Sequence, residues 1–369
     1  GGEFQTITAG EYQTIIDTTG ASWLRDGRIV GADNVQGVVY LWDASGRRVR
    51  SVGRRGAGPG EFQLISWLGN CGGDSIFVWD FGLRRMTVLS SFGRILRQFT
   101  IPLRRTDGSP PYRLACSKGG RLAALLLPEE QSAPRHGSVS ARSLVRVVTL
   151  DSRGNRQREW GQVLGDEYVL DRNGAMLPRP LGEATYIAMS DEHLFLGESR
   201  SDTVSVAALG NDQRRNVPLG TESRPATQRH GEEAIRALVS FANDPDIRER
   251  MEQLPKEAPM PSQLPRYSGL HSDPEGNLWT VMTTAGDSAT RLLVHSSSGE
   301  LLARLELPHF LQVFEVGSTY VLGRYAPAGR GVRVAAFRLH RPATARAPTL
   351  KRRRSGEPLQ RTIFWRRQR

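Results

Sequence analysis

The sequence predicts an all-β protein: a six-bladed β-propeller with a short helical insertion between blades four and five. Short apolar runs alternate with tight turns along most of the 369 residues, and the runs group into six units of three or four expected strands. Where no insertion intervenes, corresponding strands follow one another at 42 to 47 residues. This period, with four strands per repeat, is typical of propeller blades. The first apolar residues of the second strands are Ile29, Ile76, Leu122, Leu194, Leu278 and Tyr320.

The first two units show the pattern of a blade most clearly. Each contains apolar runs rich in β-branched and aromatic residues, separated by turns that contain glycine. One twisted four-stranded sheet cannot cover both of its faces, whereas six sheets around an axis bury them against one another and leave only short edges. Strands are expected over 22–24, 28–32, 37–42 and 47–52 in the first unit, and over 64–68, 76–79, 85–89 and 95–101 in the second.

The later units are less regular. The third is interrupted by a loop at 128–141, followed by two strands within 144–160, and the sixth offers only three strands. A spare strand within residues 3–16 is expected to supply the missing one and to close the ring by joining the two ends of the chain. We therefore assign residues 1–340 to one propeller domain, with 1–20 as its closing segment.

The largest insertion covers residues 221–265. Ala234, Ile235 and Leu238 have the i, i+3, i+4 spacing of an amphipathic helix. The sequence Asn243-Asp244-Pro245 is expected to end this helix and to start a second, short one that runs to Leu254. The insertion is either a surface elaboration packed on one blade or a lid beside the central channel.

The charge of the chain is concentrated at its C-terminal end. Residues 341–369 hold ten Lys or Arg and one acid, Glu357, out of a formal net charge of +12 for the whole chain. The rest is therefore close to neutral, and we predict that 341–369 is a disordered basic tail. Nucleic acid is not an expected partner. No apolar run approaches the roughly 20 residues of a membrane-spanning helix, so no membrane span is expected.

The two cysteines leave two readings open. Cys71 and Cys116 are too few for a disulfide scaffold or a zinc site of the usual ligand count. They fall near matching points of neighbouring repeats, just before glycine-containing turns. They form either a bridge in an oxidising compartment or two separate, partly buried thiols.

Several segments together resemble the six-bladed propellers of the NHL-repeat type. These are GAGPGEF (56–62), SIFVWD (75–80), RRMTVLSSFGRILRQFTIP (84–102) and, in the fifth unit, DPEGNLW (273–279). The resemblance spans about residues 20–340, and the layout is similar to secreted or lipoprotein propellers of environmental bacteria. It implies a periplasmic or extracellular location, with a leader peptide absent from this chain. It also implies structural ion pairs of Asp80 with Arg84 or Arg85, and of Glu198 with Arg200.

Motifs of catalysis are absent from the sequence. It contains no GxSxG nucleophile elbow, HExxH, Walker A, dinucleotide-binding GxGxxG or CxxC. The seven histidines show no spacing of metal ligands. His271 and His295 fall in expected strands of the fifth unit, where we interpret them as structural sheet histidines.

The candidate binding residues lie in or near the inner strands, where they are expected to face the central channel. They are Trp23, Trp67, Tyr186 and Glu315. Exposed aromatic rings there would suit a sugar or peptide, and the alternative role of the same rings is core packing between blades.

The predicted function is non-catalytic. We expect an extracytoplasmic, monomeric propeller that binds a protein, peptide or glycan on one face of the ring and needs no cofactor. The alternative is a calcium-dependent lactonase or esterase with its site in the channel, as in some six-bladed propellers. Apart from Glu315 the inner strands offer almost no carboxylates for such a site.

Overall fold

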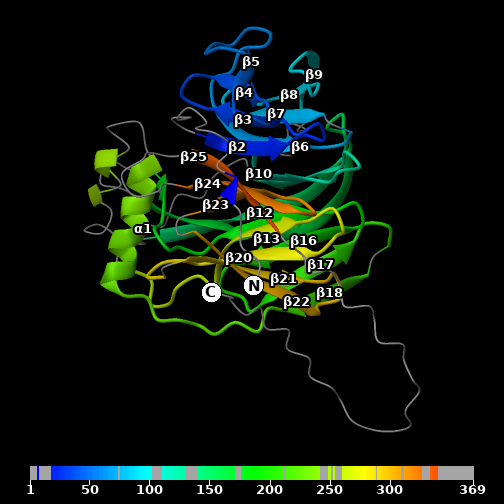
Figure 1. Ribbon diagram of the computed structural model, residues 1–369. Helices are drawn as coiled ribbons and strands as arrows, with labels where there is room; N and C mark the ends of the chain where they lie inside the picture. Colours follow the sequence, from blue (N-terminus) through cyan, green and yellow to red (C-terminus); the bar gives the residue numbers. More distant parts are fainter. Residues whose placement is uncertain are drawn as a thin grey trace.

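The fold is a closed ring of six antiparallel sheets; Figure 1 shows the strands of these sheets and the helix beside them. The computed structural model describes residues 6–7, 18–73, 75–101, 110–128, 140–170, 176–211, 213–241, 248–250, 252–253, 260–287, 289–308, 311–325 and 333–339. The first strands of the six sheets contact one another in chain order, and the last contacts the first. The predicted six-bladed propeller is therefore confirmed.

Each sheet is one blade, numbered along the chain. Blade one contains β2 (Thr18–Trp23), β3 (Ile29–Asp33), β4 (Val38–Trp42) and β5 (Arg48–Val52). Blade two contains β6 (Ile65–Asn70), β7 (Ile76–Asp80), β8 (Arg85–Leu89) and β9 (Ile95–Thr100). Blade three contains β10 (Pro111–Cys116), β11 (Leu122–Leu126), β12 (Ser140–Leu150), β13 (Arg156–Leu170) and β14 (Met176–Pro178).

The second half of the ring follows the same order. Blade four contains β15 (Thr185–Met189), β16 (His193–Glu198), β17 (Thr203–Ala208) and β18 (Arg214–Pro218). Blade five contains β19 (Tyr267–Ser272), β20 (Leu278–Met282), β21 (Ala289–His295) and β22 (Leu301–Pro308). Blade six contains β23 (Gln312–Val316), β24 (Tyr320–Tyr325), β25 (Arg333–Arg338) and β1 (Thr6–Ile7).

The outermost strand of blade six comes from the opposite end of the chain. Thr6 pairs with Phe337, and Ile7 with Ala336, in antiparallel register. One sheet therefore contains both an N-terminal and a C-terminal strand. Residues 340–369 lie outside the described residues, so the disorder of the basic tail stays a prediction.

The core is divided among the junctions between blades. Six clusters of buried side chains occupy the six junctions, and in one of them Phe77 and Trp79 of blade two pack with Leu114 of blade three. β3, β7 and β11 are buried along their whole length because both of their faces meet neighbouring blades. They therefore appear in the sequence as continuous apolar runs. The outer strands β5 and β9 are largely exposed.

The glycine-rich connector before blade two is a structural element. Phe62 is fully buried, and the carboxylate of Glu61 accepts a hydrogen bond from the amide of Gly58 at 2.8 Å. A Cβ on Gly56 would meet the Glu61 carboxylate, so a larger residue there would have to displace that side chain from its hydrogen bond with Gly58. The guanidinium of Arg85 donates to the carbonyl oxygens of Gly58 and Glu61 at 3.0 and 2.6 Å.

Asp80 holds this connector without an ion pair. Its carboxylate is buried and accepts hydrogen bonds from the backbone amides of Gln63 at 2.7 Å and Leu83 at 2.9 Å. The expected pairing with Arg84 or Arg85 was wrong, since backbone amides satisfy the carboxylate and Arg85 binds carbonyl groups. The physical reason is that bringing a second charge into this site would add its desolvation cost, whereas the amides are already in place.

Blade three has longer strands, and one strand more, than the sequence predicts. β12 and β13 extend beyond the range 144–160, and β14 adds a fifth strand. Register shifts between Arg142 and Leu144 and between Val147 and Val148 interrupt the ladder, as β-bulges do where a strand bends. The extension supplies Asp166, whose contacts are described below.

The insertion between blades four and five contains the helix α1 (Gln228–Phe241), and helical residues recur at 248–250 and 252–253. α1 lies outside the six sheets at one side of the molecule (Figure 1). Its Glu233 accepts a hydrogen bond from the amide of Gly286 in blade five at 2.8 Å. Arg224, before the helix, pairs with Asp287 at 3.0 Å. No helix in the described part of the chain is long and apolar enough to cross a membrane.

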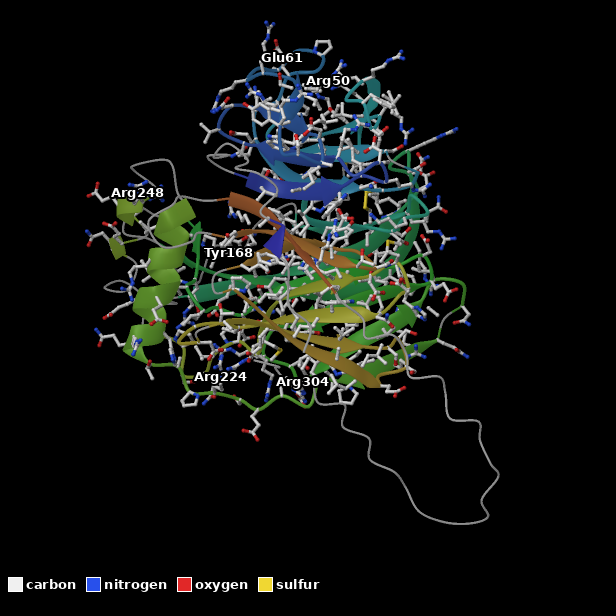
Figure 2. All side chains as sticks on the ribbon, viewed as in Figure 1. Arg50, Glu61, Tyr168, Arg224, Arg248 and Arg304 are labelled. Carbon is white, nitrogen blue, oxygen red and sulfur yellow. A yellow bond between two sulfur atoms is a disulfide. The ribbon has the colours of Figure 1, made fainter. Side chains whose placement is uncertain are left out.

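Cys71 and Cys116 form a disulfide, with their Cα atoms 5.6 Å apart. It joins the segments at the ends of the inner strands β6 and β10, and both sulfurs belong to the cluster between blades two and three. Of the two readings that the sequence left open, the bridge is the one observed. Figure 2 shows it in yellow on the side of the molecule away from α1.

Candidate functional site

The two ends of the ring differ in their loops. Because neighbouring strands are antiparallel, alternate loops gather at opposite ends. At one end, here called the turn end, every loop has three to five residues, as in Cys71–Ser75. At the other, the connector end, some successive strands are joined by longer stretches of sequence, of which the structure describes 53–64, 219–241 and 260–266. Long loops on a rigid scaffold are where binding residues are most often found.

A polar tie crosses the ring at the turn end. The carboxylate of Glu315 in blade six pairs with Lys118 of blade three at 2.9 Å, although these blades are opposite each other in the ring. The same carboxylate accepts hydrogen bonds from the Tyr320 hydroxyl at 2.8 Å and from the Trp23 amide at 3.1 Å. Lys118 also donates to the carbonyl oxygen of Asn70 at 3.4 Å. Blades one, two, three and six are thereby joined.

Trp23 is part of this tie. Its ring lies 4.7 Å from that of Tyr320, centroid to centroid. Its carbonyl oxygen accepts a hydrogen bond from the Asn70 side chain at 3.3 Å. The structure therefore brings Trp23 and Glu315 together, and the donors around Glu315 occupy both of its oxygens.

Trp67 and Tyr186 lie elsewhere. Trp67 is half-buried on β6, where its ring covers Gly69: a Cβ there would lie 2.5 Å from the ring. It packs against the core cluster between blades two and three. This is the core-packing role that the sequence left open as the alternative to ligand binding. Tyr186 stands near the start of β15 and so belongs to the connector end. The four candidates thus do not form one site.

The connector end of blades three and four holds a cluster of aromatic and charged side chains. The guanidinium of Arg113 on β10 lies 4.4 Å from the centre of the Tyr186 ring, in a cation–π contact. Arg113 pairs with Asp166 at 2.6 Å, and Asp166 also accepts from the Thr185 amide at 3.2 Å. Asp166 and Tyr168 come from the extension of β13. We call Arg113, Asp166, Tyr168 and Tyr186 the connector-end cluster.

Burial keeps the tyrosines of this region neutral. It raises the pKa of Tyr186, which Arg113 partly offsets, and it raises the pKa of Tyr168 together with the Asp166 charge. Burial alone would lower the pKa of Arg113, but Asp166 raises it above its usual value. Arg113 therefore stays charged, and the phenol groups of Tyr168 and Tyr186 keep their protons and can donate hydrogen bonds.

The charges around the cluster are paired within the protein. Arg142 contacts Glu183 at 2.5 Å and Glu198 at 3.3 Å, and Arg200 contacts Glu183 at 3.3 Å. The expected pair of Glu198 with Arg200 was therefore wrong, because Arg142, supplied by the unforeseen part of β12, lies beside Glu198. Arg179 and Glu167 form a further pair at 2.5 Å.

His271 lies on an inner strand of the ring, close to its turn end. It is the penultimate residue of β19, as Glu315 is of β23, and the other inner strands carry Ser, Gly or Ala at this position. Burial lowers the pKa of His271 to about 4, so the ring is neutral near pH 7. His295 on β21 is buried, and its pKa is lowered by burial and by Arg304. Among the described residues, His, Cys, Asp and Glu nowhere gather in groups of three that could hold a metal ion.

Sequence reasoning missed Arg113, Asp166 and Tyr168. Arg113 was visible as a charged residue inside an expected inner strand. Asp166 and Tyr168 were hidden because the strand that holds them was expected to end at residue 160. The apolar and β-branched residues of VLGDEYVL (163–170) were the signal that β13 continues.

Comparison with known structures finds several with a similar fold and low sequence identity. No known family profile matches the sequence, and no curated protein matches it. A gluconolactonase from Xanthomonas campestris is 15% identical, with 92% of this chain and 90% of that chain covered and a TM-score of 0.45. Virginiamycin B lyase from Staphylococcus aureus is 12% identical, with 87% and 85% covered and a TM-score of 0.41. A luciferin-regenerating enzyme is 12% identical, with 92% and 96% covered and a TM-score of 0.45.

Proposed function

We propose that the protein is a non-catalytic, extracytoplasmic propeller that binds a protein, peptide or glycan partner at the connector end of its ring. The observation that carries this proposal is the asymmetry between the two ends. In the part of the chain that the structure describes, the long connection 53–64 and the insertion with α1 adjoin the connector end, whereas short turns and the Glu315–Lys118 tie occupy the other. In this proposal the protein acts as a monomer and needs no cofactor.

The chemistry of the connector-end cluster favours an uncharged polar ligand. Arg113 and Asp166 neutralise each other, and the neighbouring pair of Arg179 and Glu167 does the same. What remains for a partner is aromatic surface and neutral phenol groups. These groups suit the hydroxyls and apolar faces of sugars, or the backbone of a peptide. Tyr168 lies in the half of Figure 2 that contains α1.

The disulfide supports the extracytoplasmic location. Disulfides persist in the periplasm and outside the cell and are rare in reducing compartments. The bridge of Cys71 with Cys116 lies in a core junction between two blades, where it has a structural rather than a redox role.

The test is a binding screen with the full chain on glycan and peptide arrays, followed by titration of the best ligand. We expect Tyr168→Ala to weaken binding by about tenfold or more, since a buried aromatic contact contributes on the order of 1.4 kcal/mol or more. The matched control is Tyr320→Phe at the turn end, which should bind as the parent does. Weakening by the control variant alone would refute the connector end as the site.

The same protein serves to test the alternative, a calcium-dependent lactonase or esterase. The melting temperature with and without calcium is measured together with turnover of a lactone and aryl-ester panel. In our proposal calcium leaves the melting temperature unchanged and no substrate is hydrolysed. A rise in melting temperature with calcium, accompanied by turnover, would replace the binding function by hydrolysis.

A further inference from the structure

A second surface lies on the outer strands of blades one and two, whereas the connector-end cluster belongs to blades three and four. β5 and β9 are the last strands of their sheets, so each has one edge without a strand partner in its sheet. Their residues are largely exposed. Exposed edges of this kind are places where another chain can dock.

This surface carries unbalanced positive charge. The segments 47–52 and 90–100 contain Arg47, Arg48, Arg50, Arg94 and Arg97 and no acid. Arg47 pairs with Asp43 at 3.3 Å. In the described part of the chain, no carboxylate lies within ion-pair distance of the other four. The guanidinium groups of Arg50 and Arg94 in particular stand on exposed residues.

Exposed apolar side chains lie among these arginines. Phe92 is 63% exposed, Leu96 54% and Val49 45%. They are among the most exposed large apolar residues of the described chain, and they come from the same two outer hairpins. Apolar side chains grouped on a surface mark interaction sites more often than isolated ones do.

The two hairpins are in contact at Gly93, which places Arg50 of blade one beside the turn that holds Phe92 and Arg94. Gly93 has a φ of +73°, and a Cβ there would lie 2.8 Å from Val52 and 3.1 Å from the Arg50 side chain. The ring of Phe92 lies 4.4 Å from the guanidinium of Arg28 in blade one. We call Val49, Arg50, Phe92, Arg94 and Leu96 the outer patch; Arg97 lies outside it, since its guanidinium donates to the carbonyl oxygen of Ser152 in blade three at 2.7 Å. Arg50 is labelled at the edge of the molecule in Figure 2.

We propose that the outer patch docks an acidic protein segment that also carries apolar side chains. The planar guanidinium group matches a carboxylate with two parallel hydrogen bonds, which makes arginine suited to such pairs. The apolar side chains between the arginines match leucine or phenylalanine in the same segment, whereas the anionic backbone of a nucleic acid or a sulfated glycan carries no side chain of this kind. The basic tail of this chain is excluded as the occupant because its charge has the same sign. Charge pairing at such a rim sets the association rate and makes binding sensitive to salt.

The experiment measures binding of a short fluorescent peptide, in which glutamate alternates with leucine and serine, to the full chain at low salt. We expect the double variant Arg50→Glu/Arg94→Glu to weaken binding by about tenfold or more. The matched control is Arg304→Glu on the outer strand of blade five, which should leave the affinity unchanged. The same peptide with lysine in place of glutamate should not bind. Because these residues are exposed, both variants should keep the parent melting temperature; if Arg50→Glu/Arg94→Glu does not fold, Arg50→Gln/Arg94→Gln replaces it.

Three outcomes would overturn the proposal. The first is absence of binding of the acidic peptide at low salt. The second is an equal loss of affinity in the Arg304→Glu control, which would show a general charge effect. The third is tighter binding of heparin or of a DNA oligonucleotide than of the peptide. Each is independent of the glycan and peptide screen at the connector end, so the two proposals can fail separately.

Discussion

Glu315 shows how one carboxylate acquires a structural role from its surroundings. From the sequence it was the one inner-strand acid available to a metal. In the structure its two oxygens accept from Tyr320, Trp23 and Lys118, and its side chain is 11% exposed. A carboxylate satisfied in this way stabilises the fold and offers little to a cation.

We therefore expect Glu315→Gln to lower the free energy of unfolding by about 1–3 kcal/mol, because Lys118 loses its partner while the acceptor oxygen is kept. Chemical denaturation of the purified variant measures this. The matched control is Glu306→Gln, which removes the exposed pair with Arg291 and should change stability by less than about 1 kcal/mol. Equal effects of the two variants would contradict the tie across the ring.

His271 gives stability a dependence on pH. Its pKa in the folded protein is lowered by burial to about 4, below the 6.5 that is usual for histidine in an unfolded chain. Between these two values the unfolded chain binds more protons than the folded one, so stability falls as the pH drops from about 6.5 to about 4. Above 6.5 the contribution is fully present. Because His271 is only half-buried, we expect its share to be about 1–3 kcal/mol.

The check is the free energy of unfolding of the parent and of His271→Gln across this range. The variant should lose less stability on acidification than the parent. His193 and His295 also have lowered pKa values, and both remain in the variant, so the difference belongs to His271. Parallel curves for the two proteins would show that His271 does not titrate in this way.

At the scale of the element, the strands of blades one and two were predictable because three signals indicate the same boundaries. These are the β-propensity of the residues, the spacing of the apolar runs and the positions of the glycine turns. Repeated apolar runs and glycine turns located β6 to β9 to within one or two residues. What the sequence could not supply were the partners of side chains such as Asp80, because the nearby amides depend on how the connector returns to the sheet. The extension of blade three was missed since its bulges break the two-residue alternation.

The disulfide is the element-scale feature with the largest expected effect. The bridged cysteines are 45 residues apart, for which loop-closure entropy predicts about 4 kcal/mol of stabilisation. The variant Cys71→Ser/Cys116→Ser should therefore melt well below the parent. Reductant should lower the melting temperature of the parent and leave that of the variant unchanged. A parent whose melting is insensitive to complete reduction would contradict this role.

At the scale of the whole molecule, the ring is closed by two-residue pairing between β1 and β25. The sequence predicted this arrangement from counting alone, since blade six lacked a strand and the N-terminal segment had one to spare. Ring closure matters because each blade is stabilised mainly by its two neighbours. An open ring would expose the edge of β25 and weaken the junctions beside blade six.

Deletion of residues 1–17 tests this closure. We expect the shortened protein to melt several degrees lower and to self-associate, because the edge of β25 becomes a template for another strand. The control is deletion of 341–369, which removes most of the net positive charge and should leave the melting temperature nearly unchanged. Melting curves and size-exclusion chromatography distinguish the two. If removing the basic tail destabilised the protein as much as removing β1, the tail would be part of the folded structure. The positive charge of the tail would then have to be included in any account of the outer patch.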